Sequence, residues 1–190
     1  MSERWRCFVA VPIDDDLRRS LAAAVAAWRE DPRTDGLRWV HEDAFHLTLA
    51  FLGPVEPAAV PRISGTIERV AARHAPMTRA TARLGAFARP GSARVLWYGV
   101  NDPDGELAAL ATDLVEGLGI DRTEPHRAHV TLARARQRSV DLRGWIEEAS
   151  AAAPEGMLTV GELRLMRSHL GGGPARYETL ASFPLEGPHR

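Results

Sequence analysis

Residues 46–50 read His-Leu-Thr-Leu-Ala, and residues 129–133 read His-Val-Thr-Leu-Ala. In both stretches apolar and polar residues alternate, which is typical of a strand with one buried face. The motif recurs after a little less than half of the 190-residue chain. A near-identical copy at this distance predicts two related lobes. We therefore expect each lobe to bring one copy to a shared cleft.

The alternation also predicts which side chains of each motif are accessible. Successive side chains of a strand point to opposite faces of its sheet. The residues expected to face the core are Phe45, Leu47, Leu49 and Phe51 in the first copy and Val130 and Leu132 in the second. This arrangement leaves His46 beside Thr48, and His129 beside Thr131, on the opposite face. Each strand should therefore project one imidazole and one hydroxyl outward.

Two imidazoles in one cleft suit the hydrolysis of a cyclic phosphodiester. Because imidazole titrates near neutral pH, one ring can act as a base while the other is a protonated acid. The base activates water, and the acid protonates the departing sugar oxygen. Threonine hydroxyls beside the rings can donate hydrogen bonds to the phosphate oxygens, whose charge grows in the transition state. The sequence alone does not order the two histidines.

The rest of the chain predicts alternating strands and helices without a long linker. Strands are expected at residues 6–13, 37–40, 45–52, 78–88, 94–100, 128–135, 158–167 and 176–183, and helices at 17–28, 60–70, 107–118 and 142–152. A glycine-rich hairpin is expected at 171–174. This pattern favours an α+β fold of helices packed on largely antiparallel sheets. The length suits a single bilobal domain over residues 1–190.

The composition excludes several classes of enzyme. All 24 basic residues are arginine, so the chain can form no lysyl-nucleotide intermediate, no Schiff base and no P-loop lysine contact. The single cysteine, Cys7, rules out an internal disulfide and a cysteine-based zinc site. A net charge of −1 differs from the basic field of proteins that coat nucleic acid.

The cellular location is predicted from what the chain lacks. No window approaches the roughly 18 apolar residues that a membrane span needs. The first residues lead into a strand-like run without the pattern of a signal peptide. We therefore expect a cytoplasmic protein that does not bind membranes, and a monomer.

The motifs and their surroundings resemble the RNA 2′,3′-cyclic phosphodiesterases, also called the 2′-5′ RNA ligase family, of the two-histidine phosphoesterase superfamily. The similarity covers nearly the whole chain, most clearly residues 6–10, 38–40, 46–53, 95–100, 127–134 and 163–180. One departure is Ala128, which stands where the family often has proline before the second histidine. It should alter how the chain enters the strand and leave the chemistry unchanged.

The resemblance implies a bilobal two-histidine phosphoesterase fold. It has two pseudo-symmetric lobes, each an antiparallel sheet flanked by helices, with the active cleft between them. It also implies that His46 is the proton donor to the leaving 3′ oxygen and that His129 is the proton acceptor from water, with Thr48 and Thr131 beside them. The substrate would be RNA with a 2′,3′-cyclic phosphate end, and the product a 2′-phosphate. Reversible 2′-5′ ligation would need no nucleotide cofactor.

Four further residues are predicted to bind substrate. Arg134 and Arg127 bracket the second motif and are suited to bidentate contact with phosphate. Strict alternation places Arg134 on the core side, so its role requires a bulge or the end of the strand. Trp39 and Tyr177 are candidates to stack on a base. Phe51 is a weaker candidate, because it shares the apolar face and is expected in the core.

Other interpretations stay open at this point. The same mechanism could act on 2′-5′ oligonucleotides or on small cyclic nucleotides, and a non-catalytic nucleotide- or RNA-binding module is the alternative to an enzyme. His126 and His129, with His41 and His46, raise the question of a metal site. No acidic or cysteine partner completes it, and on a strand His126 and His129 would point to opposite faces. We therefore expect no metal and no cofactor.

Overall fold

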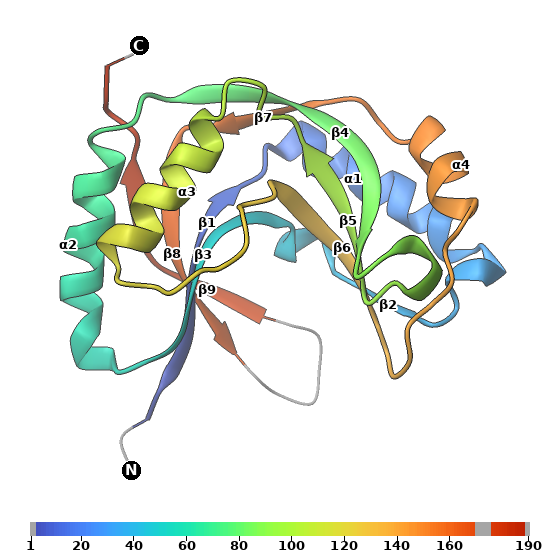
Figure 1. Ribbon diagram of the computed structural model, residues 1–190, viewed down its shortest axis with the longest axis horizontal. Helices are drawn as coiled ribbons and strands as arrows, with labels where there is room; N and C mark the ends of the chain where they lie inside the picture. Colours follow the sequence, from blue (N-terminus) through green and yellow to red (C-terminus); the bar gives the residue numbers. More distant parts are fainter. Residues whose placement is uncertain (1–2, 170–175, 189–190) are drawn as a thin grey trace.

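A curled antiparallel sheet forms the centre of the molecule (Figure 1). The computed structural model describes residues 3–169 and 176–188, so the expected hairpin at 171–174 lies outside the described residues. Within these ranges nine strands form one sheet in the order β7-β4-β5-β6-β3-β1-β8-β9, and β2 pairs with β6. The strands are β1 (Trp5–Pro12), β2 (Leu37–Trp39), β3 (His46–Val55), β4 (Met77–Phe87), β5 (Val95–Val100), β6 (His129–Ala135), β7 (Met157–Val160), β8 (Glu162–His169) and β9 (Arg176–Pro184).

The α-helices of the described ranges are α1 (Asp15–Arg29), α2 (Val60–Ala71), α3 (Glu106–Gly117) and α4 (Trp145–Ala151). In α1 the buried residues are Leu17, Leu21, Val25 and Trp28, whose spacing of three to four residues makes one apolar face. Asp15 and Asp16 occupy its first turn, where the positive end of the helix dipole favours acidic side chains. None of these helices is long and apolar enough to cross a membrane.

The sheet divides into two lobes that exchange helices. Strands β3, β1, β8 and β9 form one half and carry α2 and α3 (Figure 1). Strands β7, β4, β5 and β6 form the other half, which carries α1 and α4. There the rings of Trp28 in α1 and Trp145 in α4 meet at 6.1 Å. α1 follows β1 in the chain but packs on the half that contains β4, β5 and β6. α3 follows β5 in the chain but packs on the half that contains β1 and β3. The α+β fold and the two lobes are therefore as predicted.

The two motif strands lie side by side at the junction between the lobes. β3 and β6 are antiparallel neighbours, with Leu47 opposite Val130. Both of these side chains are fully buried, as are Leu132 and, to within 2% exposure, Leu49. Because Leu47 and Val130 face the core together, the histidines next to them in sequence turn to the opposite side of the sheet.

One predicted strand is wrong. The sequence pattern predicts a single strand over residues 158–167, but the segment divides at Gly161 into β7 and β8. β7 pairs with β4 at one end of the sheet, whereas β8 pairs with β1 in the other lobe. Local alternation carries no information about a change of partner, so the sequence pattern missed it. The other predicted strands and helices within the described residues are confirmed, with ends that differ by a few residues.

Candidate active site

All four polar residues of the twin motif line a single cavity. His46 and Thr48 come from β3, and His129 and Thr131 from β6, into a space of about 630 Å³. Most of the described residues that line it belong to strands, and none belongs to an α-helix. Neither threonine hydroxyl has a hydrogen-bond partner within the described ranges, so both are available to a ligand. The shared cleft expected from the repeat is present.

The two imidazoles are held in the same way. Nδ1 of His46 lies 2.8 Å from the carbonyl oxygen of Ala44, and Nδ1 of His129 lies 2.6 Å from that of Arg127. In each case the carbonyl belongs to the residue two positions before the histidine. A carbonyl oxygen only accepts, so Nδ1 must carry the proton and donate it. Nε2 is therefore the nitrogen that each ring offers to a ligand.

Aromatic rings flank each imidazole. The neighbours, with ring-centroid distances, are Phe8 at 4.9 Å and Tyr177 at 5.0 Å for His46, and Phe87 at 5.0 Å and Trp97 at 6.0 Å for His129. Gly85 makes room for the second pair, because a Cβ atom there would clash with the Trp97 ring. Sequence reasoning gave no site role to Phe8, Phe87 or Trp97, since these side chains reach the site from neighbouring strands.

Burial and positive charge keep both imidazoles neutral in the free protein. Burial is the main cause that lowers the pKa of His46 to about 4, with smaller contributions from Arg134 and His129. Burial also lowers the pKa of His129, again helped by Arg134 and by Arg127. The carbonyl that each Nδ1 contacts acts in the opposite direction. Near pH 7 both Nε2 atoms therefore present a lone pair.

A bulge follows each motif at the same place. Successive β1 residues pair with the residues on either side of Leu49, and successive β5 residues pair with those on either side of Leu132. Both leucines lie three positions after the motif's histidine. Because a bulge adds one residue to a strand, it reverses which later residues face each side. Phe51 and Arg134, five positions after the histidines, consequently turn toward the cavity.

These bulges explain the outcome of the sequence predictions for Arg134 and Phe51. Arg134 lines the cavity, as its expected role required. The prediction that Phe51 packs in the core is wrong, because its side chain is 63% exposed and lines the same cavity. The alternation rule failed here because Leu49 is the extra residue of a bulge in β3. The bulge depends on the register of β3 against β1, which the sequence does not reveal.

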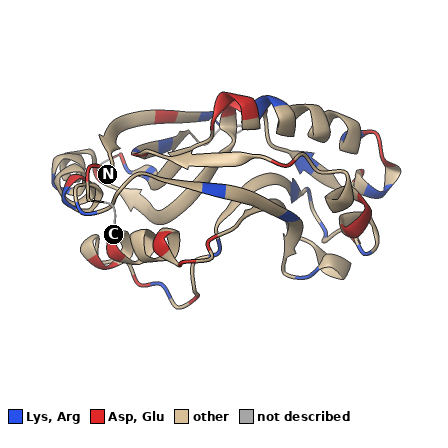
Figure 2. Cartoon of the chain, turned by 90° about the horizontal axis from the view of Figure 1, so that it is seen from above, with Lys and Arg blue, Asp and Glu red and all other residues tan. Residues whose placement is uncertain are grey.

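The cavity is suited to an anion. Among the described residues its lining includes Arg6 and Arg134 and no carboxylate. Within the described residues neither arginine lies within ion-pair distance of an acidic side chain. Elsewhere basic and acidic positions are interspersed along the chain (Figure 2). The positive charge available to a phosphate is thus local to the site, in a protein of net charge −1.

A family model, described as the 2′-5′ RNA ligase superfamily, matches residues 17–172. The chain belongs to this superfamily. The match spans both motifs and both lobes, so the family resemblance predicted from the sequence is confirmed.

Individual proteins of the superfamily are similar over most of the chain. A Geobacillus stearothermophilus protein named RNA 2′,3′-cyclic phosphodiesterase is 33% identical over 97% of this chain, which spans 59% of that longer protein. An Archaeoglobus fulgidus protein of the same name is 31% identical over 94% of this chain and 99% of its own length. The crystal structure of E. coli LigT with 3′-AMP has a TM-score of 0.75 and 26% identity, and the match covers 96% of this chain and 99% of LigT.

The remaining predicted binding residues are distributed differently. Tyr177 lines the cavity of this superfamily member, edge-on to His46. Arg127 lines an adjoining cavity instead, where its guanidinium lies 5.9 Å from the centre of the Phe87 ring. Trp39 lines neither cavity and packs, partly buried, against the core. Its predicted role in substrate binding gains no support from the geometry.

The histidines outside the motifs do not assemble a metal site. Within the described residues no three His, Cys, Asp or Glu side chains are grouped so as to hold a metal ion. The expectation that His126 and His129 point to opposite faces of a strand is wrong, because β6 begins at His129 and both residues line the adjoining cavity. There His126 Nε2 lies 3.0 Å from the Thr48 carbonyl oxygen, to which it donates.

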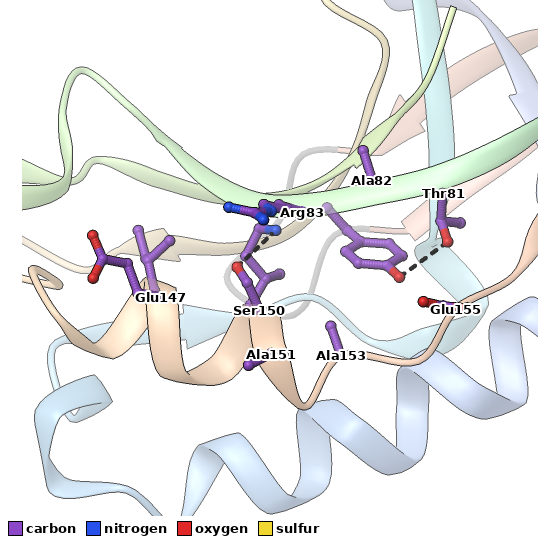
Figure 3. A pocket seen from close by; sticks show the side chains of 11 residues that line it. Thr81, Ala82, Arg83, Glu147, Ser150, Ala151, Ala153 and Glu155 are labelled. Carbon is purple, nitrogen blue, oxygen red and sulfur yellow. Dashed lines mark hydrogen bonds between the residues drawn. The ribbon is translucent and has the colours of Figure 1, made fainter.

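A third cavity, on the α4 side of β4, matches the cavity of the twin motif in size but not in chemistry. It measures about 640 Å³, and the described residues that line it include neither a histidine nor a motif residue (Figure 3). The Tyr98 hydroxyl donates to Thr81 Oγ1 at 3.1 Å, and Ser150 Oγ accepts from the Leu84 amide at 3.1 Å. Because its described lining holds neither a histidine nor a motif residue, this cavity is not the candidate active site.

Proposed function

We propose that this protein hydrolyses RNA 2′,3′-cyclic phosphate ends to 2′-phosphate ends by paired-histidine acid–base catalysis. One observation carries the proposal. Two imidazoles with the same tautomer, each beside an available threonine hydroxyl, line one cavity that holds arginine and no carboxylate among the described residues. The names of the Geobacillus and Archaeoglobus relatives support the same reaction.

The phosphate group of the substrate would be held by groups from both lobes. Thr48 and Thr131 hydroxyls donate to its two non-bridging oxygens, and Arg134 adds charge-assisted hydrogen bonds. Tyr177 and Phe51 offer aromatic surface to the terminal base. These contacts place the phosphorus atom between the two Nε2 atoms, which in-line displacement requires.

The reaction then needs two proton transfers. His129 Nε2 takes a proton from a water molecule whose oxygen attacks phosphorus. The bond between phosphorus and the 3′ oxygen breaks, and His46 Nε2 gives its proton to that oxygen. The product is a 2′-phosphomonoester with a free 3′ hydroxyl. The reaction leaves His129 protonated and His46 neutral, and exchange with solvent restores the starting state.

Substrate charge makes His46 an acid. In the free protein its low pKa leaves it neutral, which suits a base better than an acid. The bound phosphate carries a negative charge that offsets the nearby Arg134, and an opposite charge at this distance favours the protonated ring. We therefore expect His46 to take up a proton when the cyclic phosphate binds.

The scheme asks for no metal and no cofactor, because side chains supply both proton transfers and the stabilisation of charge. The absence of lysine excludes ligation through a lysyl-adenylate. Any 2′-5′ ligation would instead be the same displacement at phosphorus, with an RNA 5′ hydroxyl attacking in place of water and the 3′ oxygen leaving. The cytoplasmic location and the monomeric state stay predictions.

The test uses an RNA oligonucleotide with a 2′,3′-cyclic phosphate end, incubated with the protein in EDTA, and identifies the product end. We expect a 2′-phosphate from the natural protein and from His74→Gln, a control that lies outside both motif cavities. His46→Ala and His129→Ala should each lower the rate at least about 100-fold. Full activity in either variant, a 3′-phosphate product or dependence on added metal would contradict the proposal.

The same assay separates the alternatives. Hydrolysis of 2′-5′ oligonucleotides or small cyclic nucleotides, with no activity on the RNA end, would keep the mechanism and change the substrate. Binding of RNA without turnover in the natural protein would instead indicate a non-catalytic module.

A further inference from the structure

A second cavity continues the first along the cleft. It measures about 1080 Å³, and four of its residues, Thr48, Phe51, Phe87 and His129, also line the catalytic cavity. These shared residues come from both lobes, so the second cavity is an extension of the cleft between the lobes and is not confined to one of them. Its outer wall is the segment that joins α3 to β6, at residues 120–127.

This extension carries positive charge that no acidic side chain neutralises at close range. Arg122 and Arg127 line it, and within the described residues neither lies within 4.0 Å of a carboxylate. Asp121 and Glu124 also line the cavity, so its charge is mixed, unlike that of the catalytic cavity. The Arg127 guanidinium lies 5.7 Å from the centre of the Trp97 ring, and the His129 ring lies 6.0 Å from the same ring.

Aromatic surface marks the border between the two cavities. Phe51 and Phe87 line both. Phe51 and Met157 are the large apolar side chains that stay exposed within the described residues. Exposed aromatic rings next to arginines are the surface on which single-stranded nucleic acids stack their bases while the backbone contacts the cations.

We propose that the second cavity binds the nucleotide on the 5′ side of the one that bears the cyclic phosphate, and that Arg127 contacts the phosphodiester between them. The inference rests on the proposed function. With the cyclic phosphate held between His46 and His129, an RNA chain leaves the terminal ribose only through its 5′ oxygen. The chain must therefore follow an opening continuous with the catalytic cavity, and this one offers both arginines and aromatic rings. The enzyme then prefers RNA chain ends to mononucleotide cyclic phosphates.

The two arginines that flank the second motif thus act on different phosphates. Arg134 lies in the catalytic cavity and contacts the reacting group, whereas Arg127 lies in its extension. Arg127 stands two residues before β6 begins and Arg134 lies near the end of β6, so the motif lies between them in the chain. A substrate of a single nucleotide would use the first arginine and leave the second without a phosphate to bind.

The experiment compares kcat/KM for a trinucleotide that ends in a 2′,3′-cyclic phosphate with kcat/KM for adenosine 2′,3′-cyclic phosphate. We expect the trinucleotide to be favoured at least about tenfold by the natural protein. Arg127→Gln should reduce this ratio several-fold, and Arg122→Gln is the second variant of the same wall. The matched control is Arg83→Gln. This exposed arginine has no ion pair within the described residues, lines the remote cavity of Figure 3 and should leave the ratio unchanged when it is replaced.

Salt dependence gives a second readout. For a single-stranded substrate, each arginine–phosphate interaction that is removed lowers the slope of log affinity against log salt by about 0.7. Arg127→Gln should lower the salt slope of kcat/KM for the trinucleotide and not that for the mononucleotide. Equal kcat/KM for the two substrates in the natural protein, or an Arg127→Gln ratio equal to the natural one, would overturn the inference. Failure to hydrolyse either substrate would instead overturn the proposed function, and the inference with it.

Discussion

Arg134 has two effects that substitutions can separate. It lines the catalytic cavity as a cation without an acidic partner within the described residues, and its charge helps to lower the pKa of both His46 and His129. Arg134→Gln removes the charge and keeps a hydrogen-bonding side chain. Arg134→Lys keeps the charge and loses the bidentate geometry.

The size of the rate effect follows from the hydrogen bonds that the variants can no longer make to the phosphate. Hydrogen bonds to charged groups contribute about 1.5–3 kcal/mol. Because Arg134 is exposed at its cavity, we take a value of about 2 kcal/mol, which corresponds to about a 30-fold fall in kcat/KM at about 1.4 kcal/mol per factor of ten. Both variants should show a fall of this order.

The pH dependence distinguishes the two variants. The base of the free enzyme must be neutral, so kcat/KM falls as the pH drops through the pKa of that histidine. Loss of the Arg134 charge raises this pKa, and the acidic limb of the profile for Arg134→Gln should therefore move to higher pH. Arg134→Lys retains the charge, so its limb should stay where it is in the natural protein.

The assay measures kcat/KM for an RNA with a cyclic-phosphate end at constant ionic strength. The pH runs from about 4 to about 8, a range that spans the ordinary pKa of histidine. Two results would contradict an electrostatic effect of Arg134 on the histidines: an Arg134→Gln limb that coincides with the natural one, or an Arg134→Lys limb that moves as far as that of Arg134→Gln. Either result would mean that Arg134 does not act on the histidines through its charge.

Two other substitutions test the site. Phe51→Ala should raise KM by about 5- to 150-fold through loss of about 1–3 kcal/mol of base stacking, with little change in Tm because the ring is 63% exposed; a lower Tm with unchanged KM would assign the ring to packing instead. For His46, the unfolded chain binds a proton near pH 6.5 and the folded protein only near pH 4. The free energy of unfolding should therefore fall, by up to about 3 kcal/mol, as the pH drops from 6.5 to 4. Urea unfolding of His46→Gln should show a smaller loss over this interval, and an equal loss would contradict the lowered pKa.

The twin arrangement of the site has one structural origin. In each lobe the histidine donates Nδ1–H to the carbonyl two residues earlier, and a bulge three residues later redirects the next long side chain. The lobes then differ in what they present at that redirected position. One supplies the aromatic ring of Phe51 and the other the charge of Arg134. A pseudo-symmetric frame thereby serves a substrate whose base and phosphate are chemically different.

Much of the site could be predicted from local pattern. The alternation of the two motifs placed His46, Thr48, His129 and Thr131 on accessible faces, because the side-chain period of a strand depends only on the strand itself. The spacing of the copies predicted two lobes with a shared cleft. The absence of lysine excluded adenylating chemistry whatever the fold, since that chemistry needs a particular side chain.

Tertiary structure alone decided the features that depend on which strands become neighbours. The bulges at Leu49 and Leu132 arise from the register against β1 and β5, so they alone determine that Phe51 leaves the core and that Arg134 reaches the cavity. The division at Gly161 likewise reflects pairing with strands in different lobes. Sequence periodicity reports the faces of one strand, whereas register, flanking rings and cavity walls come from residues distant in the chain. The twin motifs therefore identified the chemistry, and the packing of the lobes decided which other residues line the cavity around the two histidines.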